Sequence, residues 1–431
     1  MDFNQKKYLM GRLIALILIA IIFSFIYTVF LSVPIDIFNI SDLFYKIGQF
    51  LGLFGFLCIS LLIISGDSAR FFDKYFGIDR IIKTQRKFAI FTYYVVFSHP
   101  IFIILSMNSY LKFLIPQFTI LSLAAGTFAL YIFTGIMISS LNYKKISYNV
   151  WQYIHIATYI LFALVWYHSF NIGSSISEPQ IEIIYYILPI LVFIGIIYRT
   201  NYKLKQRNNK FFLKEIIKET EDTFTLVIQS KYPVSFKPGQ FFFLRIEGKK
   251  LYARHPFSTS SSPSEKTLSF TMKLAGRFTK VALNLKPGQE IKMEGPFGNF
   301  ILRENKGPVF IAGGVGITPF MSIIKDNQEA KEHSNILLLY GSRTEKDIIF
   351  KESLDSIKEP WLNKVYILSQ EKKSGYEYGR MDKEFIIKHI KDLNNKTFYI
   401  CGPQEMNKLI FQALADLGVK KEDIITEDFF W

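Results

Sequence analysis

Cysteine is scarce in this chain of 431 residues, which has only Cys58 and Cys401. Two thiols so far apart in the sequence exclude a disulfide framework, a four-cysteine zinc site and an iron–sulfur cluster. Charged residues are also few, at 20%, whereas 50% of the residues are hydrophobic and 16% are aromatic. This composition is too apolar for an ordinary soluble protein and too charged for a protein that lies wholly in a membrane. We therefore expect one membrane part and one soluble part.

Long apolar runs fill the first part of the chain. Each run has roughly 20 residues, the length that a helix needs to cross about 30 Å of hydrocarbon. The sequence predicts six membrane-spanning helices, at residues 9–31, 43–65, 88–107, 118–141, 151–170 and 181–198. The first run is too long for a signal peptide and has no small-residue cleavage site after it, so we interpret it as a true span.

The positive charge is unevenly placed along this part of the chain. Lysine and arginine outnumber aspartate and glutamate by 51 to 36, and they gather before the first run and at residues 70–87, 144–145 and 199–210. These are alternate loops, so the positive-inside rule places both termini and the soluble part in the cytoplasm. We expect a multi-pass protein of the cell (plasma) membrane, with membrane lipid around it and no nucleic acid as a partner.

The sequence pattern changes after residue 210. Short alternating runs broken by Pro-Gly pairs indicate an antiparallel barrel, and after residue 304 apolar strands alternate with helical stretches, which is typical of a parallel sheet. The expected fold is therefore multi-domain. It has an all-α six-helix transmembrane bundle at residues 1–210, an antiparallel β-barrel domain at 211–304 and an α/β parallel-sheet nucleotide-binding domain at 305–431.

A glycine-rich turn follows the first strand of the predicted parallel sheet. The turn and the start of the next helix contain Gly313, Gly314, Gly316, Thr318 and Pro319. Bare backbone amides and a helix N-terminus in this position suit a pyrophosphate. A turn of this kind alone is a weak signal, because it also occurs as a mere tight turn.

Further motifs make the interpretation specific. They are His255-Pro256-Phe257-Ser258, Gly276-Arg277-Phe278-Thr279, Gly295-Pro296-Phe297-Gly298 and Cys401-Gly402-Pro403. With the glycine-rich turn, and in this order over about 220 residues, they resemble the ferredoxin–NADP reductase superfamily. The resemblance implies that FAD binds to the barrel and that a nicotinamide nucleotide binds to the parallel sheet.

The resemblance also implies roles for single residues. Phe257 would lie against the isoalloxazine and Ser258 would bond its edge, while His255, Gly276, Arg277 and Thr279 would hold the flavin pyrophosphate together with the neighbouring Pro256 and Phe278. Cys401, Gly402 and Pro403 would lie on the coenzyme. Trp431, the last residue, matches the terminal aromatic that covers the flavin; a tail packed on the domain is the alternative. Ser258, Cys401 and Trp431 are thus the expected catalytic residues.

The coenzyme preference is indicated by Ser342 and Arg343. They follow the second predicted parallel strand, where related reductases grip the ribose 2′-phosphate. NADPH is therefore expected, with NADH possible.

Three of the six histidines, His99, His155 and His168, lie within predicted spans. An ionisable side chain is costly there, and imidazole is a common ligand of haem iron. A histidine that only bonds a neighbouring helix is the alternative. With the flavin domain, the whole chain resembles the ferric reductase and NADPH oxidase family, in which a six-span haem domain precedes this reductase.

One haem ligand of that family is missing. Members have two histidine pairs, and Gln85 stands where the first histidine is expected. His155 and His168 are 13 residues apart, a rise of about 20 Å, so they cannot bind one iron. The resemblance pairs His99 with His168 on one haem b. His155 could hold a second haem with an unusual partner, could share a single haem with His99, or could bind none.

The predicted function is transmembrane electron transfer from cytosolic NADPH through FAD and haem b to an acceptor on the outer side. Dioxygen giving superoxide is the first choice of acceptor and ferric ion is the second. The alternatives are a membrane-anchored flavin reductase that feeds a partner protein, and a transport or structural protein with a degenerate reductase. No calcium-binding loop or proline-rich docking segment is evident, so no obligatory protein partner is expected.

Overall fold

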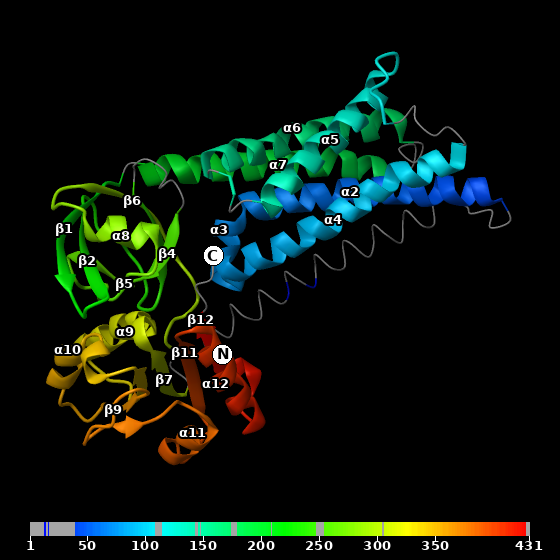
Figure 1. Cartoon of the computed structure of the whole chain (residues 1–431). Helices are drawn as coiled ribbons and strands as arrows, with labels where there is room; N and C mark the ends of the chain where they lie inside the picture. Colours follow the sequence, from blue (N-terminus) through cyan, green and yellow to red (C-terminus); the bar gives the residue numbers. More distant parts are fainter. Residues whose placement is uncertain are drawn as a thin grey trace. The chain divides into compact units, whose positions relative to one another are not determined.

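The computed structural model describes residues 39–107, 114–142, 145–146, 148–173, 179–207, 209–246, 254–303 and 306–427, together with Leu13 and Leu16. The chain divides into a helical unit that extends to Lys205 and a second unit that starts at Gln206 (Figure 1). Each unit is described by itself.

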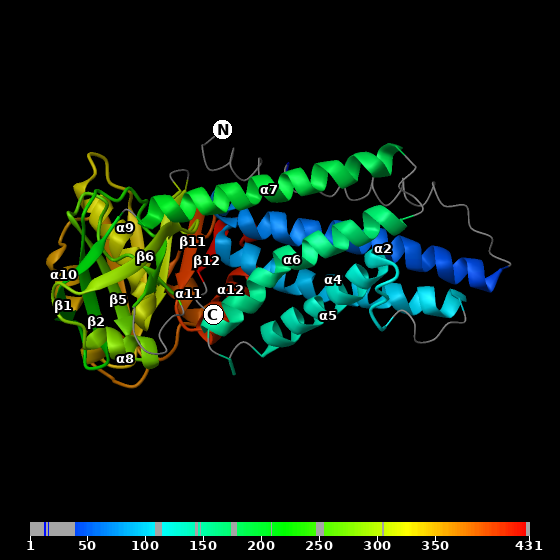
Figure 2. The same cartoon turned by 90° about the horizontal axis from the view of Figure 1, so that it is seen from above.

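The helical unit is built from long helices that run alongside one another (Figure 2). They are α2 (Ile40–Asp67), α4 (Ile78–Met107), α5 (Leu121–Leu141), α6 (Tyr148–Ile172) and α7 (Pro179–Arg207), with the short α3 (Ala69–Phe76) between the first two. Among the described residues, five helices are long and apolar enough to cross a membrane, and they cover the second to sixth predicted spans. The first predicted span, residues 9–31, falls outside the described residues apart from Leu13 and Leu16.

Glycines let α2 and α4 approach each other closely. A Cβ atom added at Gly48 would lie 2.7 Å from Cδ1 of Ile103, and one added at Gly55 would lie 2.8 Å from Cγ2 of Val96. Small residues at such crossings let the two helices pack closely. Van der Waals packing of this kind stabilises helix pairs in lipid, where no hydrophobic driving force acts between them. The α2–α4 and α5–α6 pairs have the most extensive contacts among these helices.

The second unit begins with an antiparallel sheet. Its strands are β1 (Phe211–Lys218), β2 (Thr223–Ser230), β3 (Phe241–Arg245), β4 (His255–Ser258), β5 (Thr267–Lys273) and β6 (Glu290–Phe297), in the order β4-β3-β6-β1-β2-β5. An antiparallel bridge between Thr259 and Phe270 joins the two ends of this order. The expected barrel is confirmed, and helix α8 (Arg277–Leu283) follows β5.

The unit ends with a parallel sheet. Its strands are β7 (Gly307–Gly313), β8 (Ile336–Ser342), β9 (Leu362–Leu368), β10 (Glu377–Tyr378), β11 (Lys396–Cys401) and β12 (Ile424–Glu427), and its helices are α9 (Thr318–Glu329), α10 (Lys351–Ser356), α11 (Lys383–His389) and α12 (Gln404–Asp416). The order β10-β9-β8-β7-β11-β12 places β8 on one side of β7 and β11 on the other. The chain therefore changes direction across the sheet at β7, and such a switch point opens a crevice at the carboxyl ends of the strands.

Candidate active site

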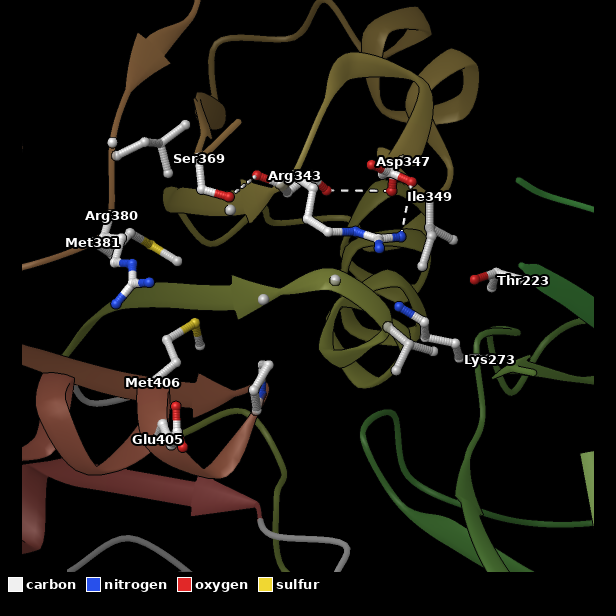
Figure 3. Close-up of a pocket in the computed structure, with 18 of the residues that line it drawn as sticks. Thr223, Lys273, Arg343, Asp347, Ile349, Ser369, Arg380, Met381, Glu405 and Met406 are labelled. Atoms are coloured by element: carbon white, nitrogen blue, oxygen red, sulfur yellow. Dashed lines mark hydrogen bonds and ion pairs between the residues drawn. The ribbon is translucent and has the colours of Figure 1, made fainter. Parts of the chain in front are cut away.

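A cavity of about 370 Å³ lies in this crevice (Figure 3). Its lining includes predicted coenzyme residues at or just after the ends of β7, β8 and β11, namely Gly313, Gly314, Ser342, Arg343 and Pro403. It also includes residues that the sequence motifs do not reveal, among them Asp222, Thr223, Lys273, Asp347, Arg380, Met381, Glu405 and Met406. In Figure 3, Thr223 and Lys273 enter from the green strands of the barrel, opposite the parallel sheet. The barrel and the parallel-sheet domain therefore both contribute to the cavity.

The glycine-rich turn after β7 packs directly on the segment after β11. A Cβ atom added at Gly316 would overlap the carbonyl oxygen of Cys401, and one added at Gly402 would lie 3.2 Å from Cα of Gly313. Gly314 has a φ of +53°, and an added Cβ atom there would meet nothing within 4 Å. The turn thus needs glycine for packing on one side and leaves its backbone open on the other, as a phosphate site requires.

Two of the predicted hydroxyl groups are used within their own turns. The Thr318 hydroxyl donates to the carbonyl oxygen of Val315 at 2.7 Å, beside Pro319 in the first turn of α9. The Thr279 hydroxyl accepts from the backbone N–H groups of Ala275 and Gly276 at 3.1 and 3.2 Å. Both hydroxyl groups therefore hold their own turns in shape, and the backbone N–H groups of Ala275 and Gly276 already have a partner.

Arg343 is held by two carboxylates in the cavity. Its Nη2 atom lies 3.2 Å from Oδ2 of Asp222 and 3.2 Å from Oδ1 of Asp347. Asp222 also pairs with Nζ of Lys273 at 3.0 Å. Partial burial acts to raise the pKa of Asp222, but hydrogen bonds from Lys273 and Thr223 and the charges of Lys273 and Arg343 hold that pKa below its usual range. Asp222 is therefore an anion at neutral pH.

The predicted flavin-binding residues come together around α8. The Phe278 ring lies 4.5 Å from the His255 ring and 5.5 Å from the Phe257 ring, between ring centroids. A Cβ atom added at Gly276 would meet nothing within 4 Å. Burial lowers the pKa of His255. At neutral pH this imidazole can therefore offer an N–H group to a phosphate but no charge, and Arg277 is the nearby cation of the motif.

Ser258 has a partner that the motifs do not reveal. Its hydroxyl donates to Oε2 of Glu427 at 3.3 Å, and both residues are buried. Glu427 is the last residue of β12, so this strand ends beside the predicted flavin-binding motif. Cys401 is also buried. Trp431 comes four residues after Glu427 and lies outside the described residues. Its stacking on the flavin therefore stays a prediction.

His99 on α4 and His168 on α6 face each other in the helical unit. Their ring centroids are 6.2 Å apart, and their planes make an angle of 74°. Nδ1 of His99 lies 2.7 Å from the carbonyl oxygen of Gly48, and Nδ1 of His168 lies 2.9 Å from that of Ser122. A carbonyl oxygen only accepts, so each Nδ1 carries the hydrogen and each Nε2 keeps a lone pair for a metal.

The two imidazoles fit a single haem iron. A metal–imidazole bond is about 2 Å long, so two opposed bonds together with the ring radii bring the ring centroids to roughly 6 Å. Glycine stands beside each ring. A Cβ atom added at Gly52 would lie 2.9 Å from Cε1 of His99, and one added at Gly126 would lie 2.5 Å from Nδ1 of His168. The neighbouring helices are therefore shaped around the rings.

His155 has different surroundings. Its ring stacks on Trp151, with centroids 4.9 Å apart and planes at 14°. Gln85, the residue in place of the family histidine, donates through Nε2 to the hydroxyl of Ser65 at 2.9 Å. The structure thus gives both residues a partner within the protein, and it pairs neither of them with a second imidazole among the described residues.

Next to His155 lies a buried polar cluster. Arg199 on α7 reaches Oδ1 of Asp67 on α2 at 2.8 Å, and the hydroxyl of Tyr159, one turn after His155 on α6, donates to the same oxygen at 2.8 Å. Asp67 is only 2% exposed. This cluster ties three helices together.

Family models match a segment of each of the three domains described above. The family model for the ferric reductase-like transmembrane component matches residues 51–166, that for an FAD-binding domain matches 208–300, and that for an oxidoreductase NAD-binding domain matches 310–411. The chain has the domain architecture of the ferric reductase and NADPH oxidase family. With these domains, it is a membrane-associated NAD(P)H–flavin oxidoreductase.

Individual relatives of this ferric reductase-like protein match about half of it. NADH-cytochrome b5 reductase 1 of Dictyostelium discoideum is 30% identical over 236 residues, which are 51% of this chain and 82% of that protein. One component of the Na⁺-translocating NADH-quinone reductase of a Marinomonas species is 29% identical over 196 residues, which are 40% of this chain and only 48% of that component. A solved ferredoxin–NADP⁺ reductase of Neisseria gonorrhoeae, with FAD and NADP bound, has 21% identity, a TM-score of 0.47, and coverage of 52% of this chain and 98% of that chain.

Proposed function

We propose that this protein transfers electrons from cytosolic NADPH through FAD and haem b to an acceptor on the outer side of the plasma membrane. Dioxygen, giving superoxide, is the first acceptor in this proposal, and ferric ion is the second. The observation that carries this proposal is that His99 and His168 face each other, with ring centroids 6.2 Å apart. The same chain has a cavity lined by both the barrel and the parallel-sheet domain. In this proposal both termini lie in the cytoplasm. The domains are the membrane bundle at residues 1–210, the FAD-binding barrel at 211–304 and the nucleotide-binding domain at 305–431.

The reductase residues have the following roles in this proposal. FAD, when bound, supplies the conversion of a two-electron hydride into single electrons. Phe257 would lie against its ring, and Ser258, oriented by Glu427, would bond the ring edge. His255, Arg277 and the open loop at Gly276 would hold its pyrophosphate, and the Thr279 hydroxyl keeps that loop in shape. The backbone after β7, the segment Cys401–Pro403 and Arg343 hold NADPH, and Trp431 covers the flavin until the nicotinamide enters.

The helical residues hold the electron carrier. Haem, when bound, supplies a one-electron carrier within the membrane. His99 and His168 would bind such a haem, and the carbonyl groups of Gly48 and Ser122 hold the orientations of the two imidazole rings. His155 is the proposed contact for a second haem, with Gln85 or no side chain as its partner.

The decisive experiment is the haem spectrum of the purified protein in detergent, with the haem-to-FAD ratio measured for wild type and His155→Ala. We expect a Soret band in both. A ratio that decreases from two to one establishes a second haem at His155, and an unchanged ratio of one assigns all haem to His99 and His168.

The acceptor is tested with the same preparation. Superoxide formed from NADPH should reduce added cytochrome c, and superoxide dismutase should prevent this reduction. Reduction of a ferric chelate that the dismutase does not affect would favour ferric ion instead. Full NADPH oxidation with a soluble acceptor but no Soret band would overturn the haem proposal and leave a membrane-anchored flavin reductase.

A further inference from the structure

Arg343 is not a free cation in the coenzyme cavity. It follows β8 of the parallel sheet, and its Nη2 atom is shared between Asp347, four residues later, and Asp222, which lies between β1 and β2 of the barrel. Asp222 shares its Oδ2 atom between Arg343 and Lys273, at 3.2 and 3.0 Å. The guanidinium that would bind a ribose 2′-phosphate is thus already neutralised, in part by a residue of the other domain.

These ion pairs are accessible to a competing anion. The side chain of Arg343 is 50% exposed and that of Asp222 is 34% exposed. Exposed pairs contribute at most about 1 kcal/mol each, because water screens them. A phosphate monoester carries a charge of about −1.5 to −2 at neutral pH and can accept a two-pronged hydrogen bond from arginine. A ribose 2′-hydroxyl is neutral and cannot displace a carboxylate in this way.

The two carboxylates differ in what else they do. Oδ2 of Asp347 accepts from the backbone N–H and the hydroxyl of Thr344, at 3.1 and 2.9 Å, so Asp347 also shapes its own loop. Asp222 uses Oδ1 to accept from the hydroxyl groups of Thr223 and Thr220, at 3.0 and 3.4 Å, and it directs Oδ2 to the two cations. An asparagine at position 222 can keep the first bond while it removes the charge.

We propose that Asp222, a residue of the FAD-binding barrel, sets coenzyme selectivity by competing with the 2′-phosphate of NADPH for Arg343. This inference rests on the proposed coenzyme role of Arg343. Asp222 lowers the preference for NADPH over NADH, because only NADPH has to displace it. The selectivity of the nucleotide domain therefore depends on its neighbour in the fold.

The test compares Asp222→Asn with wild type in the full-length, FAD-loaded protein, with ferricyanide as the acceptor. The ratio of kcat/KM for NADPH to that for NADH should increase about twofold to fivefold in the variant. Asp423→Asn is the matched control. It removes the same charge from an ion pair with Lys306, 2.6 Å long, that is not part of the cavity lining, and it should leave the ratio unchanged.

A double variant identifies the cation involved. In Arg343→Ala, the further substitution Asp222→Asn should have no effect on the ratio, because the contested group is gone. An increase that persists without Arg343, or an equal change for both coenzymes in Asp222→Asn, would overturn the proposal. Binding of adenosine 2′,5′-bisphosphate gives a readout without turnover, and Asp222→Asn should tighten it more than it tightens binding of 5′-AMP. Because ferricyanide takes electrons from the flavin, these results do not depend on whether the proposed haem pathway exists.

Discussion

The helical unit presents histidine at two levels, and the two levels are built differently. At the first, His99 and His168 face each other, each ring donates through Nδ1 to a carbonyl oxygen, and a glycine stands beside each ring. At the second, His155 stacks on Trp151, and Gln85 donates to Ser65. We infer that a pair of haem-binding histidines is identified by the groups that orient their rings. The presence of a histidine in a membrane span is not enough.

Removal of one imidazole from the paired level should have the largest effect. His168→Leu removes one of the two facing imidazoles that would bind the haem, so we expect the haem content at this pair to fall at least tenfold. The Soret absorbance per FAD measures this loss. The ferricyanide activity with NADPH should stay near that of wild type, since the reductase unit keeps its own residues. Retention of all haem in this variant would contradict the pairing of His99 with His168.

Supplying the imidazole missing from the second level should add a haem. In Gln85→His, α4 would carry histidines 14 residues apart, matching the spacing of 13 residues on α6. We expect about one more haem per FAD in Gln85→His than in Gln85→Leu, which has no ligating atom at that position. Pyridine haem quantitation measures the difference. Equal haem contents in the two variants would show that this level cannot bind haem even with two histidines.

The glycine beside His168 offers a smaller perturbation. In Gly126→Ala, the new Cβ atom would lie 2.5 Å from Nδ1 of His168, so the ring or helix α5 must shift. We expect the haem content to decrease by up to about 10-fold, because loss of the contacts that orient a ligand weakens metal binding by about this factor. Gly135→Ala on the same helix is the control, because its Cβ atom would meet nothing within 4 Å. If both variants bind haem like wild type, the close packing around His168 is not needed for ligation.

The polar cluster beside His155 should affect stability more than haem at the paired level. Asp67→Asn leaves Arg199 without its buried carboxylate, and we expect a loss of about 2–3 kcal/mol, less than for a fully buried pair because Arg199 is partly exposed. Thermal unfolding of the helical unit in detergent measures the change. Adding Arg199→Met should restore part of the loss, since no unpaired charge remains. A double variant less stable than Asp67→Asn would contradict this view of the cluster.

Much of this architecture follows from local sequence signals. The five described helices could be predicted from the length of the apolar runs, and the barrel and parallel sheet from alternation and Pro-Gly breaks. The sequence predicts that the glycine-rich turn and the segment Cys401–Pro403 both bind the coenzyme. The structure shows that they pack on each other, because Gly316 leaves room for the carbonyl oxygen of Cys401.

Other parts of the site could not be predicted, because tertiary packing alone brings them together. Gly48 and Ser122 bond histidines that are 51 and 46 residues away, on helices whose packing no local pattern encodes. Asp222 reaches Arg343 across 121 residues, from a barrel turn that resembles any other turn. The motifs predict that Thr279 and Thr318 bind phosphate, and only the structure shows their hydroxyl groups engaged in their own turns.

The bonds from His99 and His168 to backbone carbonyls have a thermodynamic consequence for the proposed haem. An imidazole that donates through Nδ1 becomes a stronger electron donor through Nε2. Two such rings would stabilise ferric over ferrous iron and make the midpoint potential more negative. The driving force from iron to dioxygen would then grow while that from flavin to iron would shrink. The carbonyl groups of Gly48 on α2 and Ser122 on α5 would thus set how the total driving force is shared between electron transfer from flavin to iron and electron transfer from iron to dioxygen.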